Sequence, residues 1–150
     1  GEEHGMLINI DSICGKDVSE GKLSVVESCS FIAPFDIKRI YYTYKVNAGI
    51  TRGFHAHKEL QQILICMYGK IEVTLDNGEG NVDTFILDSP EKGLYVGAQT
   101  WRTMKWLESD SVLLVLASEH YNESDYIRDY EEFIRRIKAK GDKNKNADTI

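Results

Sequence analysis

Two histidines separated by one residue, His55 and His57, are the side chains of this 150-residue chain best suited to chemistry. On a β-strand, side chains two positions apart point to the same face, so both imidazoles would project together. An imidazole titrates near neutral pH and can act as a general base and then as a general acid. The pair alone is a weak signal, because two histidines often lie at the surface or are satisfied in a core.

Polar neighbours strengthen this interpretation. Arg52, Lys58 and Gln62 stand close to the histidines, in a segment that runs directly into the apolar stretch Ile63–Tyr68. A buried face lined by such groups needs a ligand or a mutual hydrogen-bond network, because an unsatisfied buried polar group is costly. We therefore expect this segment to form a functional face.

Short strands divided by turn signals must position these residues. The expected strands are Lys38–Val46, Ile63–Tyr68, Ile71–Leu75, Val82–Leu87, Gly93–Gly97 and Val112–Ala117. Between two of them, Asp76-Asn77-Gly78 is a strong hairpin signal. Several strands at short intervals, with no helix between them, predict an antiparallel sandwich or barrel.

The end of the chain follows a helical pattern. From Ser124 onward, apolar residues recur every three or four positions, at Ile127, Tyr130, Ile134 and Ile137. This spacing predicts an amphipathic helix that packs on the barrel or on a partner subunit. Gly141 is expected as its C-cap, and residues 142–150 as a disordered polar tail.

Composition narrows the class of protein. The chain is 42% hydrophobic and 28% charged, and 24 acidic against 18 basic residues give a net charge of −6. The acidic balance argues against nucleic-acid binding, which requires a basic face. No apolar stretch is long enough to cross a membrane and no signal peptide is recognised, so we expect no membrane association and a cytoplasmic protein.

The cysteines agree with that compartment. Cys14, Cys29 and Cys66 are an odd number without CxxC spacing, which fits reduced thiols better than a disulfide framework or a zinc site. Residues 1–5 precede Met6 and resemble a tag remnant, which leaves residues 6–140 as the expected single domain and 141–150 as the tail.

The spacing around the histidines matches the first cupin motif. Gly49 is followed by five residues, His55-Ala56-His57, four residues, Gln62, six residues and Gly69. The motif has a glutamate where this chain has Gln62, and the histidine of the second cupin motif falls on Arg102. This resemblance implies an all-β cupin fold (a double-stranded β-helix or jelly-roll barrel), to which the C-terminal α-helix is added.

The two departures from the motif bear on metal binding. Metal-binding cupins use both histidines, the glutamate and the second-motif histidine. Here Gln62 is neutral, and the guanidinium of Arg102 stays protonated and has no lone pair to donate. We therefore expect no metal and no cofactor, and a pocket suited to an anionic or polyhydroxylated ligand.

Three further segments narrow the resemblance. Arg52-Gly53-Phe54-His55 is similar to the RGxH motif of nucleotide-sugar 3,5-epimerases. Arg52–Lys58, Asp88–Val96 and Val112–Phe133 closely resemble the sugar 3,4-ketoisomerases (the WxcM-like family), and the likeness extends over about Leu23–Phe133. It implies a homodimeric isomerase, an intramolecular oxidoreductase, acting on dTDP-4-keto-6-deoxyglucose. The implied pathway is deoxysugar biosynthesis, for O-antigen or S-layer glycans.

The implied reaction moves a carbonyl from C4 to C3 of the sugar through an enediolate. We assign His57 as the base at C3, with His55 exchanging oxygen-bound protons or sharing the role; the epimerase-like motif reverses this order. Gln62, Tyr41 and Arg39 are candidate donors to the enediolate oxygens. The remaining candidates for substrate binding are Arg52 and Lys58 at the pyrophosphate, Arg102 at the sugar or a phosphate, and Trp101 and Tyr95 on thymine.

Structural roles compete with several assignments. Arg39 could pair with an acidic neighbour at the surface, and Trp101 could belong to the core, as could Trp106. At least one of Tyr41, Tyr42 and Tyr44 must pack in the core or at a subunit interface. Glu123, Asp125 and Asp129 are expected to form a solvated acidic face that caps the helix.

Two other functions stay open from the sequence. A 3,5-epimerase would need a separate acid, commonly a tyrosine, on the opposite face of the sugar. A non-catalytic nucleotide-sugar-binding cupin would exchange no sugar hydrogen with solvent. The configuration of the product at C4, gluco or galacto, is also open, with Arg102 and Lys22 as the residues in question.

Overall fold

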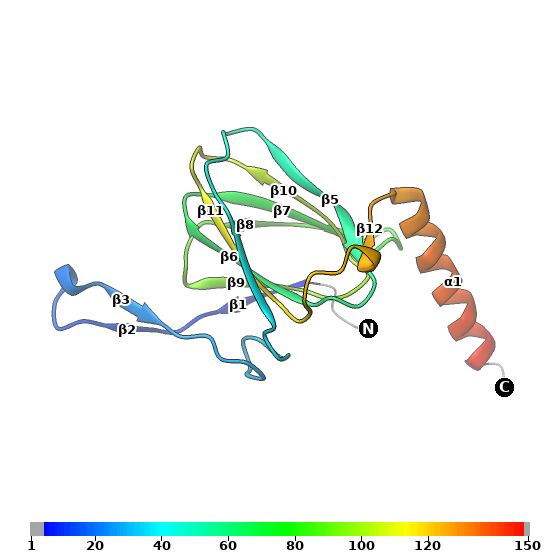
Figure 1. Ribbon diagram of the computed structural model, residues 1–150, viewed down its shortest axis with the longest axis horizontal. Coiled ribbons are helices and arrows are strands. Elements are labelled where there is room, and N and C mark those ends of the chain that lie inside the picture. The colour runs from blue at the N-terminus through cyan, green and yellow to red at the C-terminus, as the bar shows by residue number, and fades with distance from the viewer. Residues whose placement is uncertain (1–4, 149–150) are drawn as a thin grey trace.

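The computed structural model describes residues 5–148 and shows two five-stranded sheets packed face to face (Figure 1). In spatial order, the first sheet contains β1 (Gly5–Asn9), β9 (Lys92–Val96), β6 (Gln62–Tyr68), β11 (Val112–Ala117) and β4 (Arg39–Thr43). The second contains β12 (Tyr126–Ile127), β5 (Thr51–His57), β10 (Trp101–Trp106), β7 (Ile71–Asp76) and β8 (Val82–Leu87). Neighbouring strands within both sheets pair antiparallel, as the predicted barrel requires.

Alternating side chains explain why these segments form strands. In β7, Ile71, Val73 and Leu75 are buried between the sheets, while the residues between them are only partly buried. The hairpin after β7 turns where predicted: the backbone N–H of Gly78 donates to Oδ1 of Asp76 at 2.7 Å. The predicted strand Lys38–Val46 is shorter than expected, because β4 ends at Thr43 and the chain turns at Lys45, whose φ is 58°.

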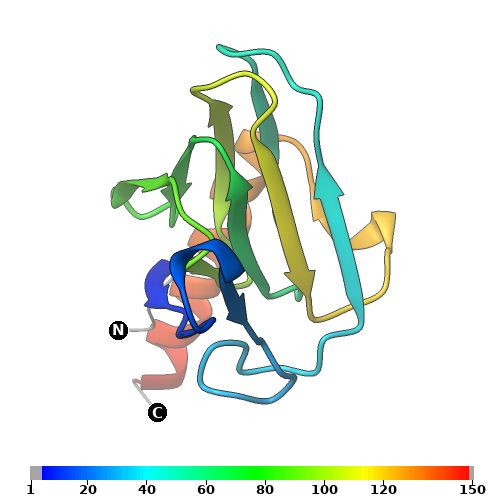
Figure 2. The same ribbon diagram turned by 90° about the vertical axis from the view of Figure 1, so that its left-hand side faces the viewer.

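A hairpin that the sequence did not predict projects from the barrel (Figures 1 and 2). It consists of β2 (Ser12–Cys14), β3 (Lys22–Ser24) and the short 3₁₀ helix η1 (Val18–Glu20) between them. After the hairpin, residues 26–37 run back along the outer face of the first sheet. There they join a second apolar cluster that includes Phe35, Ile63 and Leu116.

The C-terminal segment packs against one end of the second sheet, at β12 and the end of β5 (Figure 1). It runs through the 3₁₀ helix η2 (Glu123–Asp125) and β12 into α1 (Tyr130–Asp148). Phe133 and Ile137 of α1 are buried against Ala56 and Ile127. The predicted helix is therefore present, but its expected start at Ser124 is wrong, because Ile127 lies on a strand.

The expected end of the helix also differs. Gly141 is not a C-cap, because α1 passes through it and continues to Asp148, which includes most of the expected polar tail. Residues 1–4, part of the supposed tag, and residues 149–150 lie outside the described residues. Within residues 5–148, no helix combines the length and the apolar character that a membrane span requires.

Candidate active site

A bulge in β5 sets the direction of the two histidines. Its register against β10 shifts between Arg102 and Thr103, and Gly53 and Phe54 both have positive φ, of 96° and 59°. Gly53 is required there, because a Cβ at this position would lie 2.9 Å from the carbonyl oxygen of Arg102. Local strain is thus concentrated immediately before His55.

After the bulge, β5 alternates between the helix side and the interior. Ala56 is completely buried under α1, whereas the rings of His55 and His57 lie together on the opposite face. Their centroids are 4.9 Å apart at an interplanar angle of 85°. The prediction that both imidazoles share one face is confirmed. Tyr126 packs against both rings, with centroids 5.1 Å from His55 and 4.3 Å from His57.

A cavity of about 450 Å³ opens between the sheets on the side of His55, and we call it the barrel cavity. Its charged and polar lining comprises Tyr41, Thr43, Arg52, His55, Gln62, Arg102, Tyr126 and Arg128. Its remaining walls include Phe54, Met104 and Trp106. The volume and the cationic, hydrogen-bonding lining suit a sugar that carries phosphate groups.

A second depression of about 530 Å³, the outer hollow, lies on the side of His57. It is lined by Arg39, His57, Glu59, Leu60, Glu119, His120, Tyr121, Asn122, Asp125 and Tyr126. Tyr126 belongs to both linings, so the two spaces meet at this residue.

Inside the barrel cavity, Arg102 and Gln62 form a buried network. Arg102 donates from Nη1 to Oε1 of Gln62, and from Nη2 to the carbonyl of Thr100 at 3.0 Å. Nε2 of Gln62 donates to the hydroxyl of Tyr41 at 2.7 Å. Burial lowers the pKa of Arg102 to about 10, so the guanidinium is still charged at neutral pH. Burial also raises the pKa of Tyr41, which keeps the phenol neutral.

The same network leaves no suitable set of ligands for a divalent cation. The amide oxygen of Gln62 is occupied by a buried guanidinium, which would repel a metal ion, and Nδ1 of His57 is held by Asp125. Among residues 5–148, no three His, Cys, Asp or Glu side chains cluster in a way that could hold a metal. The donor set at the cupin metal position does not fit a metal.

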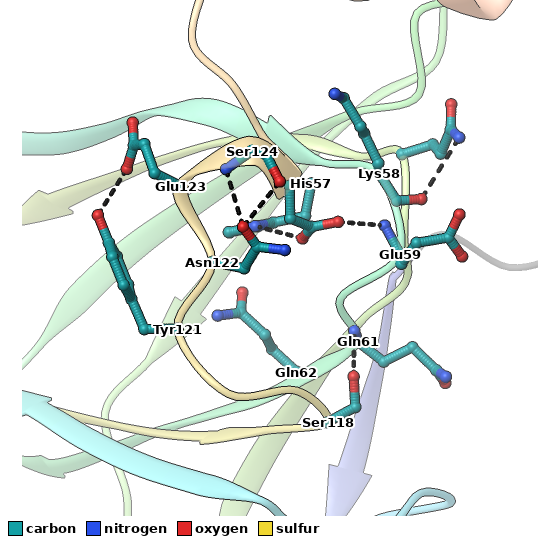
Figure 3. A network of polar contacts seen from close by, with 12 residues as sticks. His57, Lys58, Glu59, Gln61, Gln62, Ser118, Tyr121, Asn122, Glu123 and Ser124 are labelled. Atoms are coloured by element: carbon teal, nitrogen blue, oxygen red, sulfur yellow. Dashed lines mark hydrogen bonds and ion pairs between the residues drawn. The ribbon is translucent and has the colours of Figure 1, made fainter.

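His57 is anchored by a carboxylate from the C-terminal segment. Its Nδ1 lies 3.1 Å from Oδ2 of Asp125, and its side chain is 1% exposed. The other oxygen of Asp125 accepts the backbone N–H of Glu59 at 2.8 Å, and its carbonyl accepts that of Lys58 at 2.9 Å. Figure 3 shows the turn that carries Asn122 and Ser124 lying against this end of β5.

Three buried side-chain nitrogens among the described residues have no hydrogen-bond partner: Nε of Arg39, Nδ1 of His55 and Nε2 of His57. All three belong to residues that line the barrel cavity or the outer hollow. Buried polar atoms are rarely left unpaired, so a cluster of three indicates a site that a ligand completes.

Both histidines are neutral at physiological pH. Burial, followed by the charge of Arg102, lowers the pKa of His55 to about 4 and the pKa of His57 to about 2. Each imidazole therefore offers a free lone pair, which is the form that a general base requires.

The other predicted site residues are divided between these spaces and the outer surface. Arg52 lines the barrel cavity and Arg39 lines the outer hollow. Instead of pairing with a surface carboxylate, Arg39 lies over the rings of Tyr41 and Tyr121, at 5.1 and 5.7 Å. Lys58 lines neither space, and in Figure 3 its side chain runs away from Gln62.

The two aromatic residues expected to stack on thymine lie elsewhere. Trp101 packs beneath α1, with its ring centroid 5.2 Å from that of Tyr130 and 5.8 Å from that of Phe133. Tyr95 lies on the outer face of the first sheet and donates its hydroxyl to Gln61 at 2.7 Å. The placement of these side chains corrects the expectation, because strand alternation turns both away from the interior. Lys22 pairs with Glu91 at 2.7 Å near the projecting hairpin.

Sequence reasoning missed three residues from the C-terminal segment. Asp125 binds His57 instead of joining a solvated acidic face, and Tyr126 and Arg128 line the barrel cavity. Arg128 lies 4.2 Å over the ring of Tyr126 and pairs with Glu123 at 2.7 Å. The only signal was the family-like segment itself, because the contact between β12 and β5 joins residues about 70 positions apart.

Fold and site together define a cupin with a polar, cationic cavity between its sheets and without the usual metal ligands. The model of the WxcM-like, C-terminal family matches residues 3–138, and the chain belongs to this family. This result confirms the resemblance seen in the sequence.

Individual relatives in sequence and structure support the same family assignment. The chain is 46% identical over 119 residues to a TDP-4-oxo-6-deoxy-α-D-glucose-3,4-oxoisomerase of Aneurinibacillus thermoaerophilus, with 79% of this chain and 84% of the relative covered. A 3,4-ketoisomerase from Helicobacter canadensis superposes with a TM-score of 0.83 at 43% identity, over 91% of this chain and 99% of the other. A histidine-to-asparagine variant of a 3,4-ketoisomerase from Thermoanaerobacterium thermosaccharolyticum, in complex with TDP-4-keto-6-deoxyglucose, gives 0.84 at 40% identity, over 93% and 97%.

Proposed function

We propose that this protein is a metal-independent 3,4-ketoisomerase that converts dTDP-4-keto-6-deoxyglucose into a dTDP-3-keto-6-deoxyhexose. The observation that carries the proposal is the cluster of unpartnered, neutral histidine nitrogens beside a cationic cavity. The family relatives, one of them a histidine variant bound to TDP-4-keto-6-deoxyglucose, support the same substrate class.

His55 is our candidate for the carbon base. It lines the barrel cavity, whereas His57 stands behind it on the side of the outer hollow. This geometry favours the order that the epimerase-like motif implies over the one that places His57 first. His55 takes the proton from C3, the C–H electron pair forms the C3=C4 double bond, and the carbonyl electron pair moves to O4. Protonation at C4 and transfer of the O3 proton to O4 complete the isomerisation.

The buried network supplies the electrostatic support for this intermediate. Negative charge develops on O4, in a cavity where Arg102 is held rigidly by Gln62 and Thr100. A preorganised cation in a buried site stabilises such charge without reorganising during the reaction. Tyr41 provides a neutral hydroxyl on the same wall. Arg52 and Arg128 on the lining are the candidates for the pyrophosphate.

The projecting hairpin favours a homodimer. Ile13 and Leu23 on β2 and β3 are exposed, and an isolated two-stranded hairpin is marginally stable. β4 is an edge strand whose outward side chains, Ile40 and Tyr42, are also exposed and apolar. A second copy would cover both surfaces. Light scattering should give a dimer that Leu23→Asp dissociates, whereas Ile86→Asp on β8 should not.

The cellular setting follows from the substrate class. A nucleotide-linked keto sugar is an intermediate of deoxysugar biosynthesis, and we place the protein in the cytoplasm, with an O-antigen or S-layer glycan as the end product. The cysteines Cys14, Cys29 and Cys66 are free thiols, as in a reducing compartment.

The test is a proton NMR time course with chelator-treated protein and dTDP-4-keto-6-deoxyglucose. We expect a 3-keto sugar to appear, and its C4 coupling pattern gives the gluco or galacto configuration. Exchange at C3 and C5 with the ketone retained at C4 would show a 3,5-epimerase instead. Binding of dTDP without exchange of sugar protons would show a non-catalytic binding protein.

A further inference from the structure

The ring of Tyr126 packs inside the site in a way that the proposed chemistry does not yet use. Tyr126 belongs to the edge strand β12, where it lies opposite His57 of β5. Residues directly opposite each other in antiparallel strands point to the same face of a sheet, so the ring lies on the side of the histidines. The next residue, Ile127, is completely buried on the other face, with Ala56 and Phe133, and this contact anchors the short strand.

Three groups contact the ring of Tyr126. The imidazoles of His55 and His57 pack on it with centroid distances of 5.1 and 4.3 Å, at interplanar angles of 53° and 59°. The guanidinium of Arg128 lies 4.2 Å from its centroid, in a cation–π contact. Arg128 is held in turn by Glu123, through hydrogen bonds of 2.7 and 3.0 Å. All three groups contact the ring and not the hydroxyl.

Hydrogen bonds alone do not fix the two imidazoles. Asp125 holds His57 through Nδ1, but Nε2 of His57 and Nδ1 of His55 are buried without a partner. A catalytic base must nevertheless be placed accurately, because a displacement of about 1 Å can lower a rate about 100-fold. The packing against Tyr126 supplies the contact that the missing hydrogen bonds do not.

We propose that Tyr126 is a positioning residue whose ring, and not its hydroxyl, holds both imidazoles in place and keeps water away from them. The proposal rests on the ketoisomerase function proposed above. Tyr126 lines both the barrel cavity and the outer hollow, so a smaller side chain there would admit water to the imidazoles. Burial is the main cause of the lowered pKa values of His55 and His57, and loss of the ring should therefore raise both.

The experiment compares the wild type with Tyr126→Phe, Tyr126→Leu and a matched control, Tyr130→Leu. Tyr130 also packs on two aromatic rings, at 5.2 and 5.9 Å, but it lies on α1 outside the site. Turnover is measured with dTDP-4-keto-6-deoxyglucose. We expect kcat to stay within about twofold of the wild type in Tyr126→Phe and to fall about 10–100-fold in Tyr126→Leu, with a smaller change in KM. Tyr130→Leu should keep the wild-type kcat even if its melting temperature falls.

The pH profile of kcat/KM separates positioning from a general loss of stability. The acidic limb lies near pH 4 in the wild type and should move toward pH 6.5 in Tyr126→Leu, but not in Tyr126→Phe. The charged groups that face the two imidazoles are retained in both variants, so water is the source of the shift; these groups are Arg102 of β10, Arg39 of β4, and Glu123, Asp125 and Arg128 of the C-terminal segment.

Two results would overturn the proposal. If Tyr126→Phe loses as much activity as Tyr126→Leu, the hydroxyl takes part in the reaction, as it would in a 3,5-epimerase that uses a tyrosine as its acid. If Tyr126→Leu keeps the kcat and the pH profile of the wild type, the ring positions neither histidine.

A second readout does not depend on activity. NMR titration of the histidine Cε1 protons should show no protonation of His55 or His57 between pH 7 and 4.5 in the wild type, and protonation in Tyr126→Leu. Nuclear Overhauser contacts from the Tyr126 ring to both imidazoles are expected in the wild type. Their absence contradicts the proposal even if Tyr126→Leu fails to fold. An inactive wild type refutes the ketoisomerase function instead, and the titration then decides the role of Tyr126.

Discussion

Lowering the pH should destabilise this protein through the two site histidines. The ordinary pKa of a histidine, 6.5, falls in the folded protein to about 4 for His55 and about 2 for His57. Between pH 6.5 and 4.5 the unfolded chain therefore binds protons that the folded chain does not. Stability is fully present above pH 6.5 and falls as the pH is lowered.

The magnitude follows from these values. One pH unit of differential protonation corresponds to about 1.4 kcal/mol, so the two units between pH 6.5 and 4.5 give about 2–3 kcal/mol for each histidine. Replacing either histidine by asparagine removes one titrating group. The loss of unfolding free energy between pH 7 and pH 4.5 should then shrink by about 2 kcal/mol in His55→Asn and in His57→Asn.

The assay is urea unfolding at both pH values, followed by tryptophan fluorescence. Protein concentration is held fixed, because dimer formation would couple stability to concentration. His120→Asn, at an exposed position, is the matched control. Carboxylates that contact neither histidine behave equally in every variant and cancel in the comparison; His55→Asn, which leaves the contact between His57 and Asp125 in place, is therefore the cleaner of the two variants. Equal pH-dependent losses in wild type and both site variants would refute the conclusion that these histidines are buried in their neutral form.

Three further predictions follow from the same contacts. The pH profile of kcat/KM should be flat through pH 6.5 and lose activity only near pH 4, as His55 gains a proton. Burial and then the charge of Arg102 lower the pKa of His55, so Arg102→Met, which removes the charge, should move that acidic limb upward. An inflection at pH 6.5 in the wild type would contradict this. Gly53→Ala should lower the free energy of unfolding, measured in denaturant, by about 1–3 kcal/mol and should reduce turnover. The reason is that the φ of 96° at Gly53 and the carbonyl of Arg102 leave no room for a Cβ. Full activity would show that the bulge does not position His55. Phe133→Ala should lower the free energy of unfolding in the same denaturant assay by about 3–5 kcal/mol, because the completely buried ring of Phe133 holds α1 on β5. Ile134→Ala, at a partly buried position, should lower it less.

Local patterns predicted six of the twelve strands within residues 5–148, namely β4, β6, β7, β8, β9 and β11, because each of these carries its own alternation or turn signal. β11 has the predicted bounds, and β6 and β7 differ from theirs by one residue. The β2–β3 hairpin was missed since its apolar residues are exposed in the single chain, and no buried face marks its period. The helix start was misplaced because Ile127 fits a helical repeat as well as the short strand it forms.

The site residues also differ in how far local sequence predicts their positions. His55, His57, Arg102 and Gln62 could be predicted because motif spacing brings them to one interior. Asp125 could not, because its contact with His57 depends on how a distant turn folds back on β5. Trp101 was predicted as a site residue and lies outside the site. Its residue type suits base stacking, but Arg102, the next residue on the strand, faces inward, so strand alternation directs Trp101 toward α1.

The most direct test of the central claim is loss of a single imidazole from the barrel cavity. His55→Asn and wild type are each incubated with dTDP-4-keto-6-deoxyglucose in D₂O, and the C3 proton signal is followed by NMR alongside calorimetric titration with dTDP. We predict that the wild type exchanges this proton and forms the 3-keto product, while His55→Asn binds dTDP with similar affinity and leaves C3 unexchanged. Exchange at C3 at the wild-type rate in His55→Asn would contradict the assignment of His55 as the base.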